Sequence, residues 1–362
     1  MKNGRACIQL HRMLSQIKLT KFNASLKSLP GNELCDAVSL FSGCGGSDLG
    51  LRAAGIRAVW ANDANESACE LYEAVTGTKK IIQHGDIAKM SNFPKAELLV
   101  GCYPCQGYSQ GGRRNEDDAI NYLYQHFDRA LRKILPRAFI VENVDGMRFS
   151  HNEHLLRAQL TRFRSAGYTV NWRVLDAKDY GLAQDRKRLF IVGIRSSERK
   201  RFSFPAETHG PGRENPYINI KDRIWALRKA PKNSYNEEPF HWYYLSRNRR
   251  REWNQQSTCI VAHWRHVGLH PDSPPLRKLG TDRWAFTEER FARRFSYLEC
   301  AALQGFPDPS AFSVRTVEER FRAIGNAVPP PLFANVATAL VGQLADWRIT
   351  LPFCDNRCSP AV

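Results

Sequence analysis

The sequence lacks the features that mark membrane and secreted proteins. No uninterrupted apolar stretch approaches the roughly 18 residues that a membrane-spanning helix needs. Residues 1–22 have no uninterrupted apolar core like that of a secretion signal. The ten cysteines are scattered, without the dense spacing of a secreted disulfide framework. These absences predict a soluble globular protein that works in the cytoplasm.

Acidic residues are also scarce relative to basic ones. The chain has 53 Lys and Arg against 36 Asp and Glu, which gives a net charge of +17. Residues 241–300 hold eleven Lys and Arg against six Asp and Glu, and aromatic residues lie between them. Such a surface favours a polyanionic partner, with nucleic acid as the first candidate and an anionic membrane surface as the alternative.

The hydrophobic pattern alternates between short buried strands and amphipathic helices from Ala37 to Arg195. This alternation predicts an open α/β sheet with helices on both faces and ligands at the carboxyl ends of its strands. The expected strands are 37–41, 56–61, 96–101, 138–144, 168–177 and 187–195, and the expected helices are 47–55, 118–135 and 154–167.

The chain of 362 residues is long enough for this domain and a smaller one. Residues 1–35 are basic and weakly patterned, and we interpret them as a peripheral extension. Residues 196–290 are rich in Pro, Arg and aromatic residues, which predicts a second, irregular domain. Regular secondary structure is expected again in 291–350, with a helix from Pro331 to Leu344. We interpret residues 351–362 as a tail.

Three groups of residues at the expected strand ends are candidates for binding or catalysis. FSGCGG (41–46) precedes Asp63 by the roughly 20 residues typical of a nucleotide site, where a carboxylate accepts hydrogen bonds from ribose hydroxyls. Asp86, in the segment GDI, follows the next strand and could accept from an adenine amino group. A simple tight turn at the glycines is the alternative interpretation.

The second segment, GCYPCQGYSQGG (101–112), places Cys105 between a strand and a glycine-rich loop. A thiol in that position can act as a nucleophile if backbone donors or cations lower its pKa. Cys102 and Cys105 also form a C-x-x-C, which indicates a redox dithiol as a rival. A zinc site with Cys354 and Cys358 is a further alternative.

The third feature is a buried carboxylate on one expected strand and two arginines on another. Glu142 interrupts the apolar strand AFIVENV (138–144), where a carboxylate is costly unless it is paired or protonated. QDRKR (184–188) places Arg186 and Arg188 on one face of a strand, suited to oxygen acceptors. A structural carboxylate and a basic surface strand are the alternatives.

These blocks, in this order, resemble the cytosine-5 DNA methyltransferase family. The resemblance rests on FSGCGG, GDI, PCQGYS, ENV, QDRKR, RRFSYLECAALQGFPD and AIGNAVPPPLF, and it covers residues 37–345 apart from the variable 196–290. It implies a Rossmann-like methyltransferase sheet in 36–195 that binds S-adenosylmethionine, and a target-recognition domain in 196–290. Ala64, where the family often has an aromatic residue, and Cys102, where it commonly has Gly, depart from the pattern.

The resemblance also assigns roles to single residues. It makes Cys105 the covalent nucleophile, Glu142 the partner of the cytosine ring and Arg186 the ligand of the base O2, and it adds Gln106 and Arg188 to the catalytic site. The residues that it implies for the cofactor are Phe41, Gly43, Gly45, Gly46, Asp63, Asp86, Ile87 and Asn326, and those expected on DNA are Arg247, Arg249, Arg250, Thr258 and Arg265.

The sequence leaves two other functions open, a tRNA methyltransferase of the same family and a catalytically silent DNA-binding relative. The Cys-Phe-Thr segment typical of the tRNA branch is not present, and Cys105, Glu142 and Arg186 are all retained. We expect a monomer that acts on double-stranded DNA and is paired in function with a restriction endonuclease. The sequence does not select a recognition site, for which a GC-rich palindrome such as GGCC is one candidate.

Overall fold

The computed structural model describes residues 34–104, 119–149 and 152–344, and every structural statement below refers to them. The strands are β1 Cys35–Leu40, β2 Ile56–Asp63, β3 Ile82–His84, β4 Leu98–Gly101, β5 Ala138–Val144, β6 Tyr168–Asp176, β7 Lys187–Arg195, β8 Leu276–Gly280 and β9 Arg283–Phe286. The helices are α3 Gly46–Ala53, α4 Glu66–Thr76, α5 Tyr124–Ile134, α6 Glu153–Ser165, α7 Ile220–Ile224, α8 Tyr297–Gln304, α9 Val317–Asn326 and α10 Pro330–Gln343.

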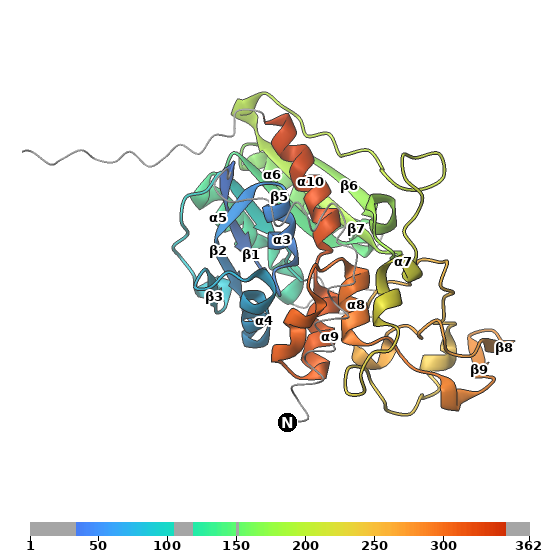
Figure 1. Ribbon diagram of the computed structural model, residues 1–362. Coiled ribbons are helices and arrows are strands. Elements are labelled where there is room, and N and C mark those ends of the chain that lie inside the picture. Colours follow the sequence, from blue (N-terminus) through green and yellow to red (C-terminus); the bar gives the residue numbers. More distant parts are fainter. Residues whose placement is uncertain (1–33, 105–118, 150–151, 345–362) are drawn as a thin grey trace, which may run out of the picture.

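Seven strands form one sheet in the order β3-β2-β1-β4-β5-β7-β6. Strands β3, β2, β1, β4 and β5 are parallel, and β7 runs antiparallel between β5 and β6. The chain leaves β1 toward β2 on one side and returns to β4 on the other. Ligands of such sheets bind where the strand order reverses, outside the carboxyl ends of the strands. The fold is therefore the predicted open α/β sheet (Figure 1).

Both faces of the sheet are covered because its central strands are apolar on both sides. On β5, Ala138 and Ile140 face the cluster that contains α3 and α10, whereas Phe139 and Val141 face the cluster that contains α5 and α6. This two-residue alternation is what a strand buried on both faces requires. Figure 1 shows α3 and α10 together in front of the sheet.

Residues 196–290 contain little regular structure, as expected from their composition. The short helix α7, the β8–β9 hairpin and several 3-10 turns are connected by irregular chain (Figure 1). Tyr244, Leu269 and Leu276 form a small buried cluster of their own. Ile220 and Ile260 instead join the cluster formed by α8 and α9. The division of the chain into domains stays a prediction.

Some element bounds differ from those expected. β1 begins at Cys35, inside the expected N-terminal extension, because Cys35 is buried and pairs with Ile56. The helix expected from residue 118 begins at Tyr124, after a 3-10 turn at Ala119–Tyr122. Helices α4 and α9 were not predicted.

One helical stretch, Val317–Gln343, is long and apolar enough to cross a membrane by length and composition alone. It consists of α9 and α10. Of its most apolar window, 72% is buried inside the protein, as in a core helix.

Candidate active site

The turn between β1 and α3 is tied to the end of β2 by Asp63. The Asp63 carboxylate accepts the backbone N–H of Gly43 at 2.9 Å and that of Asn65 at 2.9 Å. Burial raises its pKa, although these backbone donors oppose that effect. Gly43 has φ +54, and a Cβ there would project into open space. The turn therefore leaves room for a ligand beside the predicted ribose-binding carboxylate.

The other residues of this turn take strained or crowded backbone positions. Phe41 has φ 57, a left-handed conformation that costs energy for a residue with a Cβ. Gly45 caps α3 with φ 83. A Cβ on Gly46 would collide with the carbonyl oxygen of Val328, so glycine allows the late segment 325–328 to lie against the turn.

The segment after β3 brings Asp86 to the same edge of the sheet. Asn62 donates from its side chain to the carbonyls of Gln83 and Gly85, at 2.9 Å each, and so fixes this segment to β2. Asp86 is exposed and caps a short 3-10 turn by accepting the N–H of Ala88 at 2.9 Å. Ile87, the next residue, is buried. Asp86 and Asp63 thus follow neighbouring paired strands, as predicted.

A buried ion pair joins the two strands at the centre of the site. Glu142 on β5 is 7% exposed, and its Oε1 lies 3.1 Å from Nε of Arg188 on β7. Burial raises the pKa of Glu142, although Arg188 and then Arg186 act to lower it. Burial therefore shifts Glu142 toward its protonated form relative to a carboxyl group in water.

Arg186 is placed differently from the expectation that it binds the base. It is 1% exposed, and its guanidinium donates to the carbonyls of Ile260 at 2.9 Å, Gly325 at 2.9 Å and Ala327 at 2.8 Å. Desolvation lowers its pKa to about 10. Arg186 therefore holds two distant segments together, and Arg188 is the arginine that contacts Glu142.

Asn143 positions the start of the loop expected to carry the nucleophile. Its Nδ2 donates to the carbonyl of Tyr103 at 3.2 Å. Tyr103 is buried and donates from its hydroxyl to Gln159 at 2.5 Å. The chain thus leaves β4 beside β5 and Glu142. Cys105 and Gln106 lie outside the described residues.

Cys102 lies next to the site but differs from an active thiol. It is partly buried against the apolar cluster under α3 and α10. Desolvation, followed by the Coulombic effect of Glu142, raises its pKa well above the usual range. Cys354 and Cys358, the other partners considered for zinc, lie outside the described residues.

The sequence reasoning missed Cys259, the residue after Thr258. The segment 257–260 runs beside 183–185: Ser257 donates its backbone N–H to the carbonyl of Ala183, and its own carbonyl accepts the N–H of Asp185, both at 2.9 Å. This pairing brings the Cys259 Sγ to 3.4 Å from Nη1 of Arg186. In the sequence, Cys259 could have been found as a thiol next to Thr258, which was already a candidate DNA contact.

The arginines expected on DNA fall into two groups. Arg247 is exposed, and Arg265 is about half-exposed in an ion pair with Glu238 at 2.6 Å. Arg250 instead donates to the carbonyl of Ser273 at 2.6 Å. Arg249 donates to the Tyr244 carbonyl at 3.2 Å and lies over its ring. Thr258 is partly buried. Arg247 and Arg265 are therefore the better-placed candidates.

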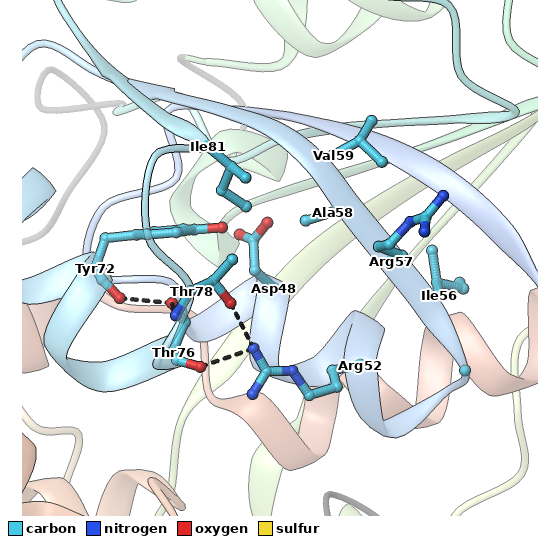
Figure 2. A pocket seen from close by; sticks show the side chains of 11 residues that line it. Asp48, Arg52, Ile56, Arg57, Ala58, Val59, Tyr72, Thr76, Thr78 and Ile81 are labelled. Atoms are coloured by element: carbon cyan, nitrogen blue, oxygen red, sulfur yellow. Dashed lines mark hydrogen bonds between the residues drawn. The ribbon is translucent and has the colours of Figure 1, made fainter. Parts of the chain in front are cut away.

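A cavity of about 410 Å³ lies away from this site, between the first half of β2, α3 and α4. Figure 2 shows the Tyr72 hydroxyl pointing toward Asp48 and the Arg52 guanidinium bonded to Thr76 and Thr78. Burial raises the pKa of Asp48 to about 6. Asp63, by contrast, ends β2 at the opposite end of the strand.

Comparisons with known proteins identify the family. The chain is 35% identical over 353 residues to the Type II methyltransferase M.BsuRI of Bacillus subtilis, covering 87% of this chain and 80% of the relative. It is also 35% identical over 324 residues to M.NgoPII of Neisseria gonorrhoeae, with 84% and 94% covered. The family of C-5 cytosine-specific DNA methylases matches residues 35–342.

Solved structures share the fold at low sequence identity. A DNA modification methyltransferase from an E. coli prophage superposes with a TM-score of 0.64 at 19% identity, covering 86% of this chain and 99% of that one. The Dnmt2 methyltransferase of S. pombe gives a TM-score of 0.58 at 17% identity, with 86% and 99% covered. From these matches, and from the order of strands and motifs, the chain belongs to the family of C-5 cytosine-specific DNA methylases.

Proposed function

We propose that the protein transfers a methyl group from S-adenosylmethionine to C5 of a cytosine that is flipped out of double-stranded DNA. The observation that carries this proposal is Glu142, a buried carboxyl with a raised pKa, in contact with Arg188. Both lie where the loop of Cys105 begins, at the carboxyl edge of the sheet.

The residues present fit the cofactor. Three features lie at the ends of three adjacent strands of the sheet. Open space lies beside Gly43 after β1, the Asp63 carboxylate ends β2, and the exposed Asp86 follows β3. A carboxylate has about four acceptor positions, so Asp63 keeps capacity for ribose hydroxyls beyond its two backbone bonds. When bound there, S-adenosylmethionine supplies an electrophilic methyl group.

Cytosine C5 is a poor nucleophile, so the enzyme must first activate the ring. Addition of the Cys105 thiolate at C6 makes C5 an enamine-like carbon that can attack a methyl group. A protonated Glu142 donates to N3 and so favours this addition, because it neutralises the charge that develops on the ring. A base then removes the C5 proton, and Cys105 is eliminated.

We assign the contact with the base O2 to Arg188 in place of Arg186. Arg188 already contacts Glu142, and its side chain is 13% exposed. Arg186 has its Nη atoms occupied by backbone carbonyls and acts instead as a positioning residue for 259–260 and 325–327.

The target base is stacked in the duplex, so it must be extruded at an unstacking cost of a few kcal/mol. Contacts from the basic region 196–290, with Arg247 and Arg265 on phosphates or guanine edges, offset this cost. We propose that the enzyme is a cytoplasmic monomer, and that it protects the sites of a partner restriction endonuclease.

The test is to incubate the full chain with labelled S-adenosylmethionine and a mixed-sequence duplex, and to sequence the product for 5-methylcytosine. We expect label in DNA at one short recognition sequence, and none with Cys105→Ser. A parallel reaction with tRNA separates the alternative substrate. Label only in tRNA, or full activity of Cys105→Ser on DNA, would overturn the proposal.

A further inference from the structure

We propose that Cys259 is a second reactive thiol of this enzyme, a modification site for peroxides that lies beside the arginines of the active site. The catalytic proposal above assigns no role to this residue. Oxidation there is expected to suppress methyl transfer reversibly. Only that consequence depends on the proposed function; the reactivity of the thiol does not.

The first support is the position of the sulfur among cationic side chains. Cys259 Sγ lies 3.4 Å from Nη1 of Arg186 and also interacts with Arg188. Arg188 in turn pairs with Glu142 at 3.1 Å. A thiol held between two guanidinium groups has its anionic form stabilised by charge and by hydrogen bonds.

The second support is a contrast with the other described cysteines. Cys259 is exposed, whereas Cys35, Cys44, Cys69 and Cys300 are buried. Burial raises the pKa of Cys44 to about 12. The pKa of Cys259 is lowered instead: its desolvation acts upward, but Arg186 and Arg188 outweigh it. Accessibility and thiolate character therefore coincide at this cysteine, and these two properties govern thiol oxidation.

The third support is an unsatisfied donor on the buried arginine that contacts the sulfur. Nε of Arg186, in a side chain 1% exposed, has no hydrogen-bond partner among the described residues. The guanidinium therefore keeps capacity for one more acceptor. An oxygen added to the sulfur would lie beside Nη1 of the same guanidinium, where it is a stronger acceptor than the thiol.

The oxidation balances with the peroxide as its only other reactant. The Cys259 thiolate attacks one oxygen of the peroxide, an S–O bond forms and the O–O bond breaks. Hydroxide leaves and takes up a proton to become water, so the sulfur is oxidised by two electrons and the peroxide is reduced. To reverse the oxidation, one small thiol condenses with the sulfenic acid to a mixed disulfide and releases water; a second equivalent then reduces this disulfide, which restores Cys259 and leaves the small thiol's own disulfide.

The consequence for the active site follows from the shared arginines. Oxygen on Cys259 competes with Glu142 for Arg188, the residue that we assign to the base O2. It also adds bulk beside the contact between Arg186 and Ile260. Oxidation is thus expected to weaken binding of the target base.

The site is tested by alkylation of the full chain with iodoacetamide at pH 7, in the native state and in urea. Trypsin isolates Cys259 in the peptide 252–265, apart from the peptide 96–113 that holds Cys102 and Cys105. We expect a native-to-denatured rate ratio above one for Cys259. The ratio should lie far below one for the peptide 295–315, which contains only the buried Cys300.

Peroxide followed by dimedone, which traps sulfenic acids, should label the peptide 252–265 of the native protein. Arg188→Leu should lower the alkylation rate of Cys259, and Arg277→Leu, at an exposed arginine of β8, should not. Alkylation of Cys300 reports whether either variant has unfolded. A ratio at or below one for Cys259 in the wild type, or no dimedone adduct on 252–265, would overturn the proposed site.

The regulatory consequence has its own test. Wild type and Cys259→Ser are treated with peroxide, and the residual methyl transfer of each is compared with its own untreated sample. The wild type should lose activity faster and regain part of it with a thiol reductant. Equal rates of loss would overturn the consequence, while the labelling decides the site independently.

Discussion

Glu142 combines two properties that a general acid needs, burial and a raised pKa. Gln keeps the shape of this side chain but cannot release or take up a proton. We therefore predict that Glu142→Gln lowers kcat by about 10²-fold or more, the range typical for loss of acid–base catalysis. The measurement is the initial rate of methyl transfer at saturating cofactor.

Glu153→Gln is the matched control, because Glu153 is about half-exposed on α6 and, among the described residues, pairs only with Arg157, at 2.8 Å. Its kcat should equal that of the wild type. A Glu142→Gln enzyme that retained half of the wild-type kcat would contradict the assigned role.

The two arginines of QDRKR should respond differently to substitution by Lys. Arg186→Lys loses the planar fork that reaches carbonyls on two segments, so we predict a free energy of unfolding lower by about 3 kcal/mol. Arg188→Lys should keep most of its stability but lose methyl transfer. Urea unfolding and kcat, measured on both variants, check this; the reverse pattern would return the base contact to Arg186.

The residue types of this site were predictable from sequence, but the partners of Arg186 were not. A buried Glu in an apolar strand and arginines two residues apart are local patterns. The bonds of Arg186 reach residues 74 and 141 positions away, to Ile260 and Ala327. Only the packing of α9 and of the irregular region against the sheet determines which arginine faces the site.

At the scale of elements, strands buried on both faces were predicted best. The bounds of β5 and β7 match the expected 138–144 and 187–195, because each strand contains a continuous apolar run, 138–141 and 189–194. Helix α9 was missed because its apolar face is broken by charged residues, and its start depends on the Thr316–Glu319 capping box. Capping is a local signal, yet it needs a clear hydrophobic period beside it to be recognised.

Helix α8 depends on a buried carboxylate at its N-terminus. Glu299 accepts the backbone N–H of Ser296 at 2.8 Å, and both of its oxygens lie 2.8 Å from the Arg293 guanidinium. His270 lies 3.3 Å away. Although burial opposes the effect, Arg293 and His270 hold the pKa of Glu299 at about 2. The cap is therefore strong only while Glu299 is ionised.

We predict that Glu299→Gln lowers the free energy of unfolding at pH 7 by about 3 kcal/mol, which follows from a pKa lowered from 4.5 to about 2. A depressed pKa stabilises the fold above the unfolded value and loses this effect as pH falls. The difference between variant and wild type should thus shrink between pH 4.5 and 2. A constant difference across that range, by urea unfolding, would contradict the assignment.

At the scale of the whole molecule, the net charge of +17 favours binding to a polyanion. Each phosphate that the protein neutralises contributes a slope of about −0.9 to the plot of log affinity against log salt. The basic side chains are not equivalent in this respect. Arg247 is exposed, whereas Arg250 is bonded to the carbonyls of Pro271 and Ser273 and pairs with Glu252.

We therefore predict that Arg247→Ala reduces the magnitude of the salt slope by about 1 without loss of stability. Arg250→Ala should leave the slope unchanged and instead lower the free energy of unfolding by about 2 kcal/mol, because it removes bonds to two buried carbonyls. Fluorescence anisotropy with a labelled duplex at several salt concentrations measures the slope, and urea unfolding measures the stability. Equal slopes for the wild type and Arg247→Ala would mean that Arg247 meets no phosphate and that other exposed side chains carry the attraction to DNA.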